Sequence, residues 1–148
     1  MDLSNLPGHL IRKLHQQSTS VFQDRMKAGG FDLTSVQFAA LNTLDTNEGL
    51  DQATVAQRIA YDRATIGAVI KRLEQKGFVM RRRDQADRRA FKLELTEQGK
   101  ALLEELRPIV LSLQADILPT LSEIEQATLL ELMAKVLKSK AVKEPFLN

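Results

Sequence analysis

The period of the apolar residues changes from helical to extended once along this chain, between residues 78 and 95. Apolar and charged residues alternate over 91–95, which predicts a half-buried strand. Residues 78–80 provide a partner strand, and a turn at residues 84–87 joins the two. The sequence therefore predicts one β-hairpin in an otherwise helical chain. Its inward-facing residues on the second strand are expected to be Phe91, Leu93 and Leu95.

Helical periodicity predicts four helices before the hairpin. The first covers residues 6–27 and ends at the glycines of positions 29 and 30. The next three begin after residues whose side chains can accept a hydrogen bond from the first helical turn, namely Thr34, Asp51 and Asp62. The last two helices are short and joined by a tight turn, so residues 51–77 are expected to form a helix-turn-helix.

Two further helices are expected over residues 96–138, after the hairpin. Pro108 should kink the first of them or end its first segment. A capping-box pattern at residues 122–125 begins the second, and the tail at 143–148 is expected to be loose. The chain has no internal repeat and no low-complexity linker, so we expect all 148 residues to form one domain.

The charges of the chain are unevenly distributed, although its formal net charge is only +2. Residues 76–92 contain seven Lys and Arg against two Asp, a net of +5, which leaves −3 for the rest. A compact basic patch on a mildly acidic chain indicates a site for a polyanion such as nucleic acid. The alternative is a solvated charged surface.

Several classes of protein are excluded or disfavoured by what the sequence lacks. It has no cysteine, which excludes disulfides, thiolate metal sites and thiol-based redox switches. It has no HExxH pattern, Ser-His-Asp arrangement or phosphate-binding glycine loop, so we expect neither an enzyme nor a metal or cofactor. No apolar run could cross a membrane and no secretory signal is present, so a cytoplasmic protein is expected.

The helix that follows Asp62 is expected to read DNA in the major groove, because its N-terminal side chains can reach base edges. Arg63 can bond guanine in two places, and Thr65 can offer its hydroxyl or its methyl group. Small residues beside them allow the helix to approach the bases closely. The residues predicted to contact DNA here are Arg63, Ala64, Thr65, Gly67, Ala68 and Lys71.

The tip of the hairpin is expected to place an arginine in the adjacent minor groove, where the potential is most negative. Arg89 is the predicted residue, and the alternative is a solvent-facing turn residue. Asp87 is better suited to capping the hairpin or orienting arginines than to contacting DNA. The other arginines are expected to bind phosphates or form structural ion pairs. The DNA-binding prediction for the hairpin comprises Arg82, Arg83, Arg88 and Arg89, with Arg81 left between the two roles.

Four stretches of this sequence carry a resemblance to a known family. They are LTSVQFAAL at 33–41, ATIG at 64–67 continuing through RLEQKG at 72–77, DRRAFKL at 87–93, and LTEQG at 95–99. Between residues 33 and 106 the chain resembles the MarR family of bacterial transcriptional regulators. The family's wing pattern is Asp, any residue, Arg, three residues, then Val or Leu, and it is matched by Asp87, Arg89 and Leu93.

The resemblance implies a mainly α fold with a winged helix-turn-helix at residues 33–95, of which 78–95 form the wing. It also implies an obligate homodimer in which two winged domains read a palindromic operator in double-stranded DNA. Residues 6–27 and 96–138 would form the dimerisation helices. Independently, these helices carry more leucine and isoleucine than a small winged domain could cover alone.

A polar cluster on the first helix has two interpretations. His9, Arg12 and His15 recur every three residues and lie on one side of the helix. They form either a solvated polar face or a site for an anionic ligand at the dimer interface. The stretch at residues 7–16 resembles the N-terminal helix of MarR members that control degradation of aromatic acids. Further candidates for this cavity, with core packing as the alternative for both phenylalanines, are Phe22, Phe38 and Asn42.

The function expected from these patterns is that of a ligand-responsive repressor. It would bind its operator as a homodimer and release it on binding a small aromatic carboxylate or an aromatic acyl thioester. The alternative is a winged-helix module that binds DNA or a protein partner without any small-molecule ligand. A cysteine-based peroxide sensor, which the family also contains, is excluded because the chain has no cysteine.

Overall fold

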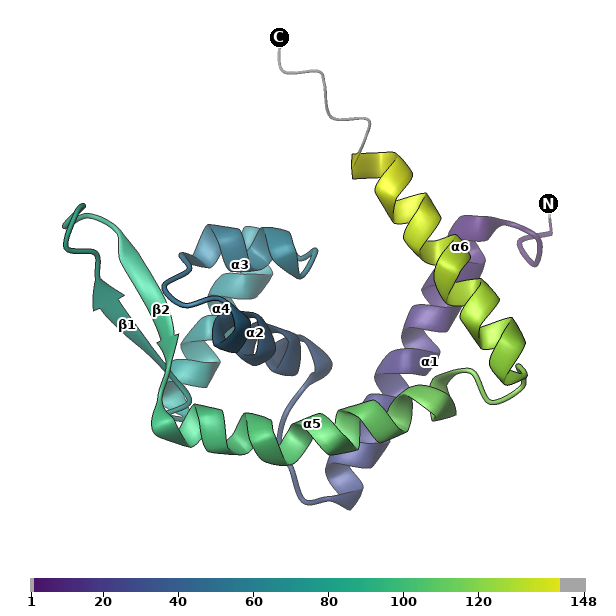
Figure 1. The fold of residues 1–148 in the computed structure, drawn as a ribbon, viewed down its shortest axis with the longest axis horizontal. Helices are drawn as coiled ribbons and strands as arrows, with labels where there is room; N and C mark the ends of the chain where they lie inside the picture. Colours follow the sequence, from purple (N-terminus) through teal and green to yellow (C-terminus); the bar gives the residue numbers. More distant parts are fainter. Residues whose placement is uncertain (1, 142–148) are drawn as a thin grey trace, which may run out of the picture. The chain divides into compact units, whose positions relative to one another are not determined.

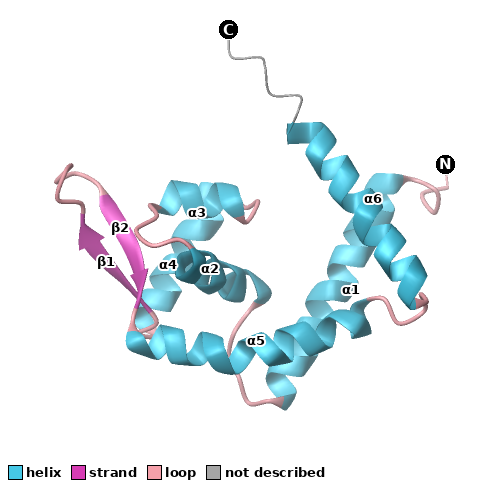
Figure 2. Ribbon diagram, in the orientation of Figure 1, coloured by secondary structure: helices cyan, strands magenta, loops and turns pink. Residues whose placement is uncertain are grey.

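The structure is a computed structural model that describes residues 2–141, with side chains through residue 138. The elements along this part of the chain, shown in Figure 1, are α1 (Pro7–Ala28), α2 (Ser35–Thr46), α3 (Gln52–Arg58), α4 (Arg63–Gln75), β1 (Val79–Arg83), β2 (Phe91–Leu95), α5 (Glu97–Ile117) and α6 (Glu123–Ala141). Figure 2 shows the two strands as a single hairpin among helices. The predicted mainly α fold with one β-hairpin is confirmed.

The chain divides into two compact units, Met1–Leu113 and Gln114–Asn148, which are described separately. The expectation of one domain over all 148 residues stays a prediction. The predicted loose tail at 143–148 lies outside the described residues.

The helix starts of the first unit follow the predicted capping residues. Thr34 and Gln37 form a reciprocal capping box, in which each side chain accepts the other residue's backbone N–H at 3.2 and 3.0 Å. Asp51 and Asp62 each accept the backbone N–H three residues ahead, at 2.7 and 2.9 Å. These bonds satisfy donors that a helix leaves unpaired at its start, so they fix where α2, α3 and α4 begin.

The core of the first unit is built around α4. One side of this helix is fully buried, through Ile66, Val69, Ile70 and Leu73, as its apolar periodicity predicts. Gly77 ends the segment with a φ of +80°, a left-handed conformation that glycine adopts without strain. The neighbouring elements contribute further side chains that are at most 2% exposed, namely Leu41, Leu44, Val55, Leu93, Leu103 and Leu106.

The hairpin pairs β1 and β2 antiparallel, with Val79 opposite Leu95 and Arg83 opposite Phe91. A third segment joins it, because the backbone N–H of Leu93 donates to the carbonyl oxygen of Leu50 at 2.8 Å. Leu50 lies between α2 and α3, so this bond ties the start of the helix-turn-helix to the wing. No sequence pattern predicts this bond.

Two details of the predicted hairpin are wrong. Phe91 is 42% exposed rather than buried, because the strands extend beyond the helices that cover Leu93 and Leu95. The guanidinium of Arg83 lies 5.8 Å from the centre of its ring. The connection is also longer than the predicted turn at residues 84–87, since regular pairing resumes only at Phe91.

Helix α5 runs continuously through Pro108, so of the two expected effects the proline does not end a segment, and the kink stays a prediction. Proline removes one backbone donor from a helix interior. Burial of Leu103, Leu106 and Leu113 on either side holds the helix in place despite that loss.

The base of the hairpin lies tightly against the start of α5. The hydroxyl of Thr96 donates to the carbonyl oxygen of Gly77 at 2.6 Å and accepts the backbone N–H of Gly99 at 3.0 Å. A Cβ atom at Gly99 would clash with the carbonyl oxygen of Phe78. Because that neighbour is backbone, the wing would have to move away from α5 to make room.

We therefore expect Gly99→Ala to lower the free energy of unfolding by about 1–3 kcal/mol, the usual cost of overpacking. Chemical denaturation at neutral pH measures the effect. The matched control is Gly8→Ala in the first turn of α1, where an added Cβ meets nothing within 4 Å. Equal stability of the two variants would show that the backbone at Phe78 yields without cost.

The second unit contains the end of α5 and helix α6. Ser122 and Glu125 form the predicted capping box, with hydrogen bonds of 3.0 and 3.2 Å. Most large apolar side chains of α6 are exposed, namely Ile124, Leu130, Leu132, Met133, Val136 and Leu137. Over the described residues, no helix combines the length and apolar character needed to cross a bilayer.

Candidate nucleic-acid interface

Helix α4 carries an outer face opposite its buried side. Arg63, at its first position, is exposed, and Thr65 and Gly67 are half-buried at the margins of this face. The exposed residues that follow along the helix are Ala64, Ala68, Lys71, Arg72 and Gln75. Arg72 and Gln75 were not among the predicted residues, although the same helical spacing would have found them.

The hydroxyl of Thr65 takes part in the cap of α4. Its Oγ1 donates to Asp62 Oδ2 at 2.7 Å, while its backbone N–H donates to Oδ1 at 2.9 Å. These hydrogen bonds, the side-chain bond first, lower the pKa of Asp62. The carboxylate is therefore ionised at neutral pH and can only accept, so the hydroxyl proton of Thr65 is committed to it.

Two neighbouring contacts join the helix-turn-helix to the wing. A Cβ atom at Gly67 would lie 3.1 Å from Gln52 Nε2, so this glycine makes room for a side chain of α3. Gln52 Oε1 in turn accepts a hydrogen bond from Arg81 Nη2 at 3.3 Å. Arg81 Nε also forms an ion pair with Glu74 Oε1 at 2.6 Å. Of the two roles left open for Arg81, the structure shows the structural ion pair.

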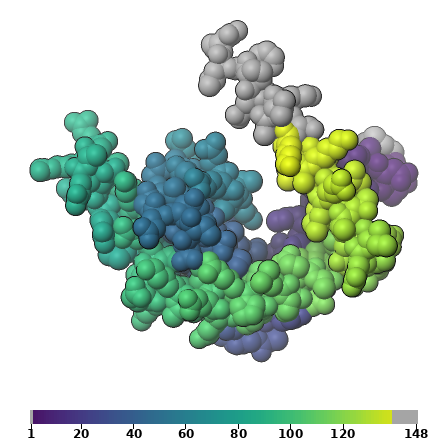
Figure 3. Space-filling model, in the orientation of Figure 1, coloured from purple at the N-terminus to yellow at the C-terminus, as the bar shows by residue number. Residues whose placement is uncertain are grey.

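The wing tip presents two arginines. Arg88 and Arg89 are exposed, and in the part of the chain that the structure describes neither side chain forms an ion pair. The backbone N–H of Arg89 donates to Asp87 Oδ1 at 3.0 Å, so Asp87 caps the turn, as expected. Figure 3 shows the tip of the hairpin projecting beyond helices α2 to α4, where it can reach a neighbouring molecule.

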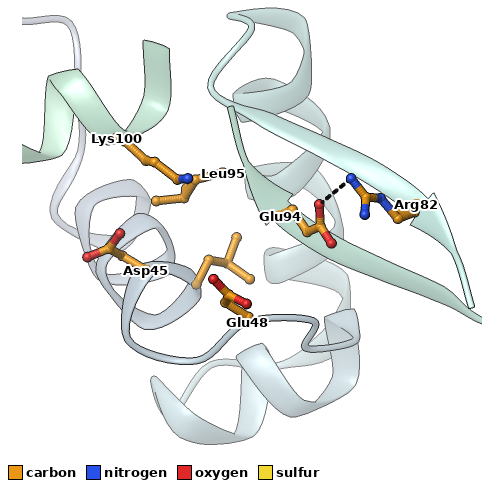
Figure 4. A pocket seen from close by; sticks show the side chains of 7 residues that line it. Asp45, Glu48, Arg82, Glu94, Leu95 and Lys100 are labelled. Carbon is orange, nitrogen blue, oxygen red and sulfur yellow. Dashed lines mark ion pairs between the residues drawn. The ribbon is translucent and has the colours of Figure 1, made fainter. Parts of the chain in front are cut away.

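Arg82 lies on the opposite side of the hairpin from Arg81 and Arg83, as strand alternation requires. Its Nη2 is 3.1 Å from Glu94 Oε2. Figure 4 shows this pair at the edge of a pocket of about 230 Å³ whose charged lining residues are Asp45, Glu48, Arg82, Glu94 and Lys100. The structure therefore pairs Arg82 with Glu94 on the neighbouring strand and does not group it with the two arginines of the tip.

The predicted ligand-binding residues fall into two groups. His9, Arg12 and His15 line one open groove on the surface of α1, and Arg12 Nη2 lies 3.0 Å from His9 Nδ1. Phe22 is 5% exposed, and its ring centre is 6.1 Å from that of Phe38 on α2.

The last predicted ligand residue, Asn42, accepts a hydrogen bond from Arg107 Nη2 of α5 at 3.4 Å. Arg107 also forms an ion pair with Asp45, one turn further along α2. The groove on α1 includes none of Phe22, Phe38 and Asn42. Over residues 2–138, no three His, Asp or Glu side chains are grouped so that they could hold a metal ion.

A helix-turn-helix with an exposed outer face, followed by a two-stranded wing with arginines at its tip, defines a winged helix-turn-helix DNA-binding protein. The MarR family model matches residues 33–91 of this chain. The HTH-type transcriptional repressor NicR of Pseudomonas putida is 34% identical over 138 residues, which cover 93% of this chain and 86% of NicR. The chain belongs to the MarR family of transcriptional regulators.

Solved structures agree with this assignment. The structure of BpsR from Bordetella bronchiseptica, described for regulation of its DNA binding by 6-hydroxynicotinic acid, is 29% identical with a TM-score of 0.84. That alignment covers 92% of this chain and 96% of BpsR. A variant of MarR from E. coli complexed with operator DNA is 27% identical with a TM-score of 0.82, covering 93% and 99% of the two chains.

Proposed function

We propose that this protein is a repressor that binds a palindromic operator as a homodimer and releases it when a small aromatic acid binds. The observation that carries the proposal is the pair of exposed arginines at the wing tip, Arg88 and Arg89, in the same compact unit as the outer face of α4. The two features can contact DNA at the same time, because α4 would enter the major groove while an arginine of the wing tip enters the minor groove beside it. Such a regulator works in the cytoplasm, where bacterial DNA lies, and does so without catalysis.

The homodimer is supported by apolar side chains that one chain leaves uncovered. In addition to those of α6, the exposed residues of the first helical region are Leu6, Leu10, Ile11 and Leu14. Several large apolar side chains exposed along one helix mark an interaction site. A two-fold dimer places two reading helices on two half-sites, about one helical turn of DNA apart. We accordingly assign residues 6–27 and 96–138 to dimerisation and 33–95 to DNA binding.

An aromatic acid as effector is supported by the groove on α1 and by the relatives. Arg12, with His9 and His15 beside it, offers a carboxylate charged and directional hydrogen bonds. BpsR, whose DNA binding is described as regulated by 6-hydroxynicotinic acid, is similar to 92% of this chain. An aromatic carboxylate or aromatic acyl thioester is therefore the class of effector that we propose, with Phe22, Phe38 and Asn42 near its ring.

Release follows from a shift between two conformations of the dimer. The effector acts only if its affinity for the conformation that does not bind DNA is higher than its affinity for the conformation that does. We propose that the bound effector fixes the two reading helices at a separation that does not match the half-sites.

The second candidate is a winged-helix module that binds DNA or a protein without an effector. It is favoured by one observation, that the groove on α1 lies open on a single helix and does not include the aromatic pair of Phe22 and Phe38.

The two candidates differ in what Arg12→Ala does to the purified protein. We expect 6-hydroxynicotinic acid, benzoate or benzoyl-coenzyme A to raise the melting temperature of the parent protein. Arg12→Ala should abolish most of that rise and leave operator affinity within about twofold, because Arg12 lies outside the winged domain. Thermal unfolding and fluorescence anisotropy measure the two quantities.

The matched control for this experiment is Lys27→Ala, which removes an exposed cation from the same helix but outside the groove. It should respond to the effector like the parent protein. If Arg12→Ala and Lys27→Ala respond equally, the effector site is not on this face of α1.

A further inference from the structure

Between Arg63 and Lys71, the outer face of α4 lacks hydrogen-bond donors. Ala64 and Ala68 are both exposed and lie one turn apart on the same side of the helix. Arg63 precedes them and Lys71 follows them, so charged donors are present only at the two ends of this stretch.

The residues between Arg63 and Lys71 do not offer DNA a hydrogen-bond donor. Ile66, Val69 and Ile70 are buried in the core, and Gly67 has no side chain. Thr65 is the one hydroxyl in the stretch, and its proton is donated to Asp62 Oδ2 at 2.7 Å. From residue 64 to residue 70, α4 therefore presents methyl groups and, at Thr65, an oxygen that can only accept.

The methyl groups of this pattern match one of the four bases in the major groove. Guanine presents two acceptors there, O6 and N7, and is read by side chains that donate. Thymine presents a C5-methyl group, which is read by apolar contact with Ala or with the methyl of Thr. The adenine paired with it presents an N6 amino donor, which an accepting oxygen can bind.

We propose that Ala64 and Ala68 of α4 read the C5-methyl groups of thymine, so that A·T pairs in each half-site are selected by apolar contact. The inference rests on the proposed function, because it takes α4 to be the helix that enters the major groove. Arg63 and Lys71 then contact guanine or phosphate at the two edges of the thymine positions.

The test replaces thymine by deoxyuridine, which removes the methyl group and keeps the base pair. The full-length protein first selects its operator from random double-stranded DNA. Half-site thymines are then replaced one symmetric pair at a time, and affinity is measured by fluorescence anisotropy. Burial of one methyl group predicts a loss of about fourfold per contact, hence about 15-fold for a contact made in both half-sites. Replacing the same T·A pair by C·G should weaken binding, and 5-methylcytosine should restore part of the loss.

Two protein variants identify the reading residues. Ala64→Gly and Ala68→Gly remove the methyl groups from the protein, so the deoxyuridine penalty should fall below about twofold in the variant that loses the contact. Any general weakening of the helix cancels, because each variant is compared with itself on two DNAs. The matched control is Lys71→Ala, which should bind both DNAs more weakly and keep the full penalty.

The outcomes separate this inference from the proposed function. If no sequence is enriched from random DNA, the proposed function is wrong. If an operator emerges and its deoxyuridine form binds the parent protein equally well, methyl reading by α4 is wrong and the proposed function stands. A penalty that persists in both glycine variants also overturns the inference, since the methyl groups are then read elsewhere.

Discussion

Replacing Arg89 by alanine is expected to weaken binding to operator and to random DNA alike, by roughly 30-fold at physiological salt. Arg89 is exposed at the wing tip, and its side chain forms no ion pair in the described part of the chain. It therefore approaches DNA without first breaking an internal contact. A homodimer loses two such contacts, so the dependence of log K on log salt should become shallower by roughly two. Fluorescence anisotropy across a salt titration, on both DNAs, measures affinity and slope together.

The matched control for Arg89→Ala is Lys27→Ala, which removes the same charge from α1, outside the winged domain. Its salt dependence should equal that of the parent protein. An unchanged slope in Arg89→Ala would mean that the hairpin is not a DNA-binding wing.

Placing glutamate at both Leu10 and Leu14 is expected to convert the proposed homodimer into a folded monomer and to lower operator affinity by about 1000-fold. Both side chains are exposed in a single chain, at 44% and 39%, so the substitutions leave the fold of the monomer intact. In the dimer they would bury charge without a partner, which is strongly unfavourable. A monomer contacts one half-site at a time and loses the gain from linked binding.

Analytical ultracentrifugation checks the first part of this prediction. The parent protein should sediment as a species of twice the 16.6 kDa chain mass, and the double variant as a single chain. Met80→Glu, an exposed apolar position on the wing, is the matched control and should remain dimeric. A folded 16.6 kDa species of the parent at micromolar concentration would contradict the homodimer.

The features predicted correctly from the sequence are those decided within one helical turn or by one periodic pattern. Asp51 and Asp62 cap their helices because the groups they bond lie three residues ahead. Gly77 ends its segment because of its own backbone conformation. The buried side of α4 follows from the spacing of its apolar residues.

The features that were missed depend on contacts between distant segments. The bond between Leu50 and Leu93 joins residues 43 positions apart, and neither residue type signals it. Phe91 continues an alternating pattern that predicts burial, but the helices beneath the hairpin end before they reach it. Only the fold decides how much of a strand is covered.

The location of the candidate site could be predicted from the sequence, but the role of each of its side chains could not. The density of cations predicts where the wing lies, and the capping of its turn by Asp87 is also predictable, but the separate roles of the hairpin arginines are not. Arg81 is held by Glu74 and Arg82 by Glu94, partners that only three-dimensional proximity supplies. The sequence also does not show that the hydroxyl of Thr65 donates its hydrogen bond to Asp62 in the cap of α4.

The most direct test of an effector-controlled operator-binding dimer is one pair of binding curves. Labelled operator is titrated with the protein, alone and with saturating 6-hydroxynicotinic acid, benzoate or benzoyl-coenzyme A, and anisotropy is recorded. We expect tight binding by the free protein and an affinity lowered by about tenfold or more in the presence of at least one of the three compounds. Binding curves that superimpose with and without every one of them would show that no effector of this class controls operator binding.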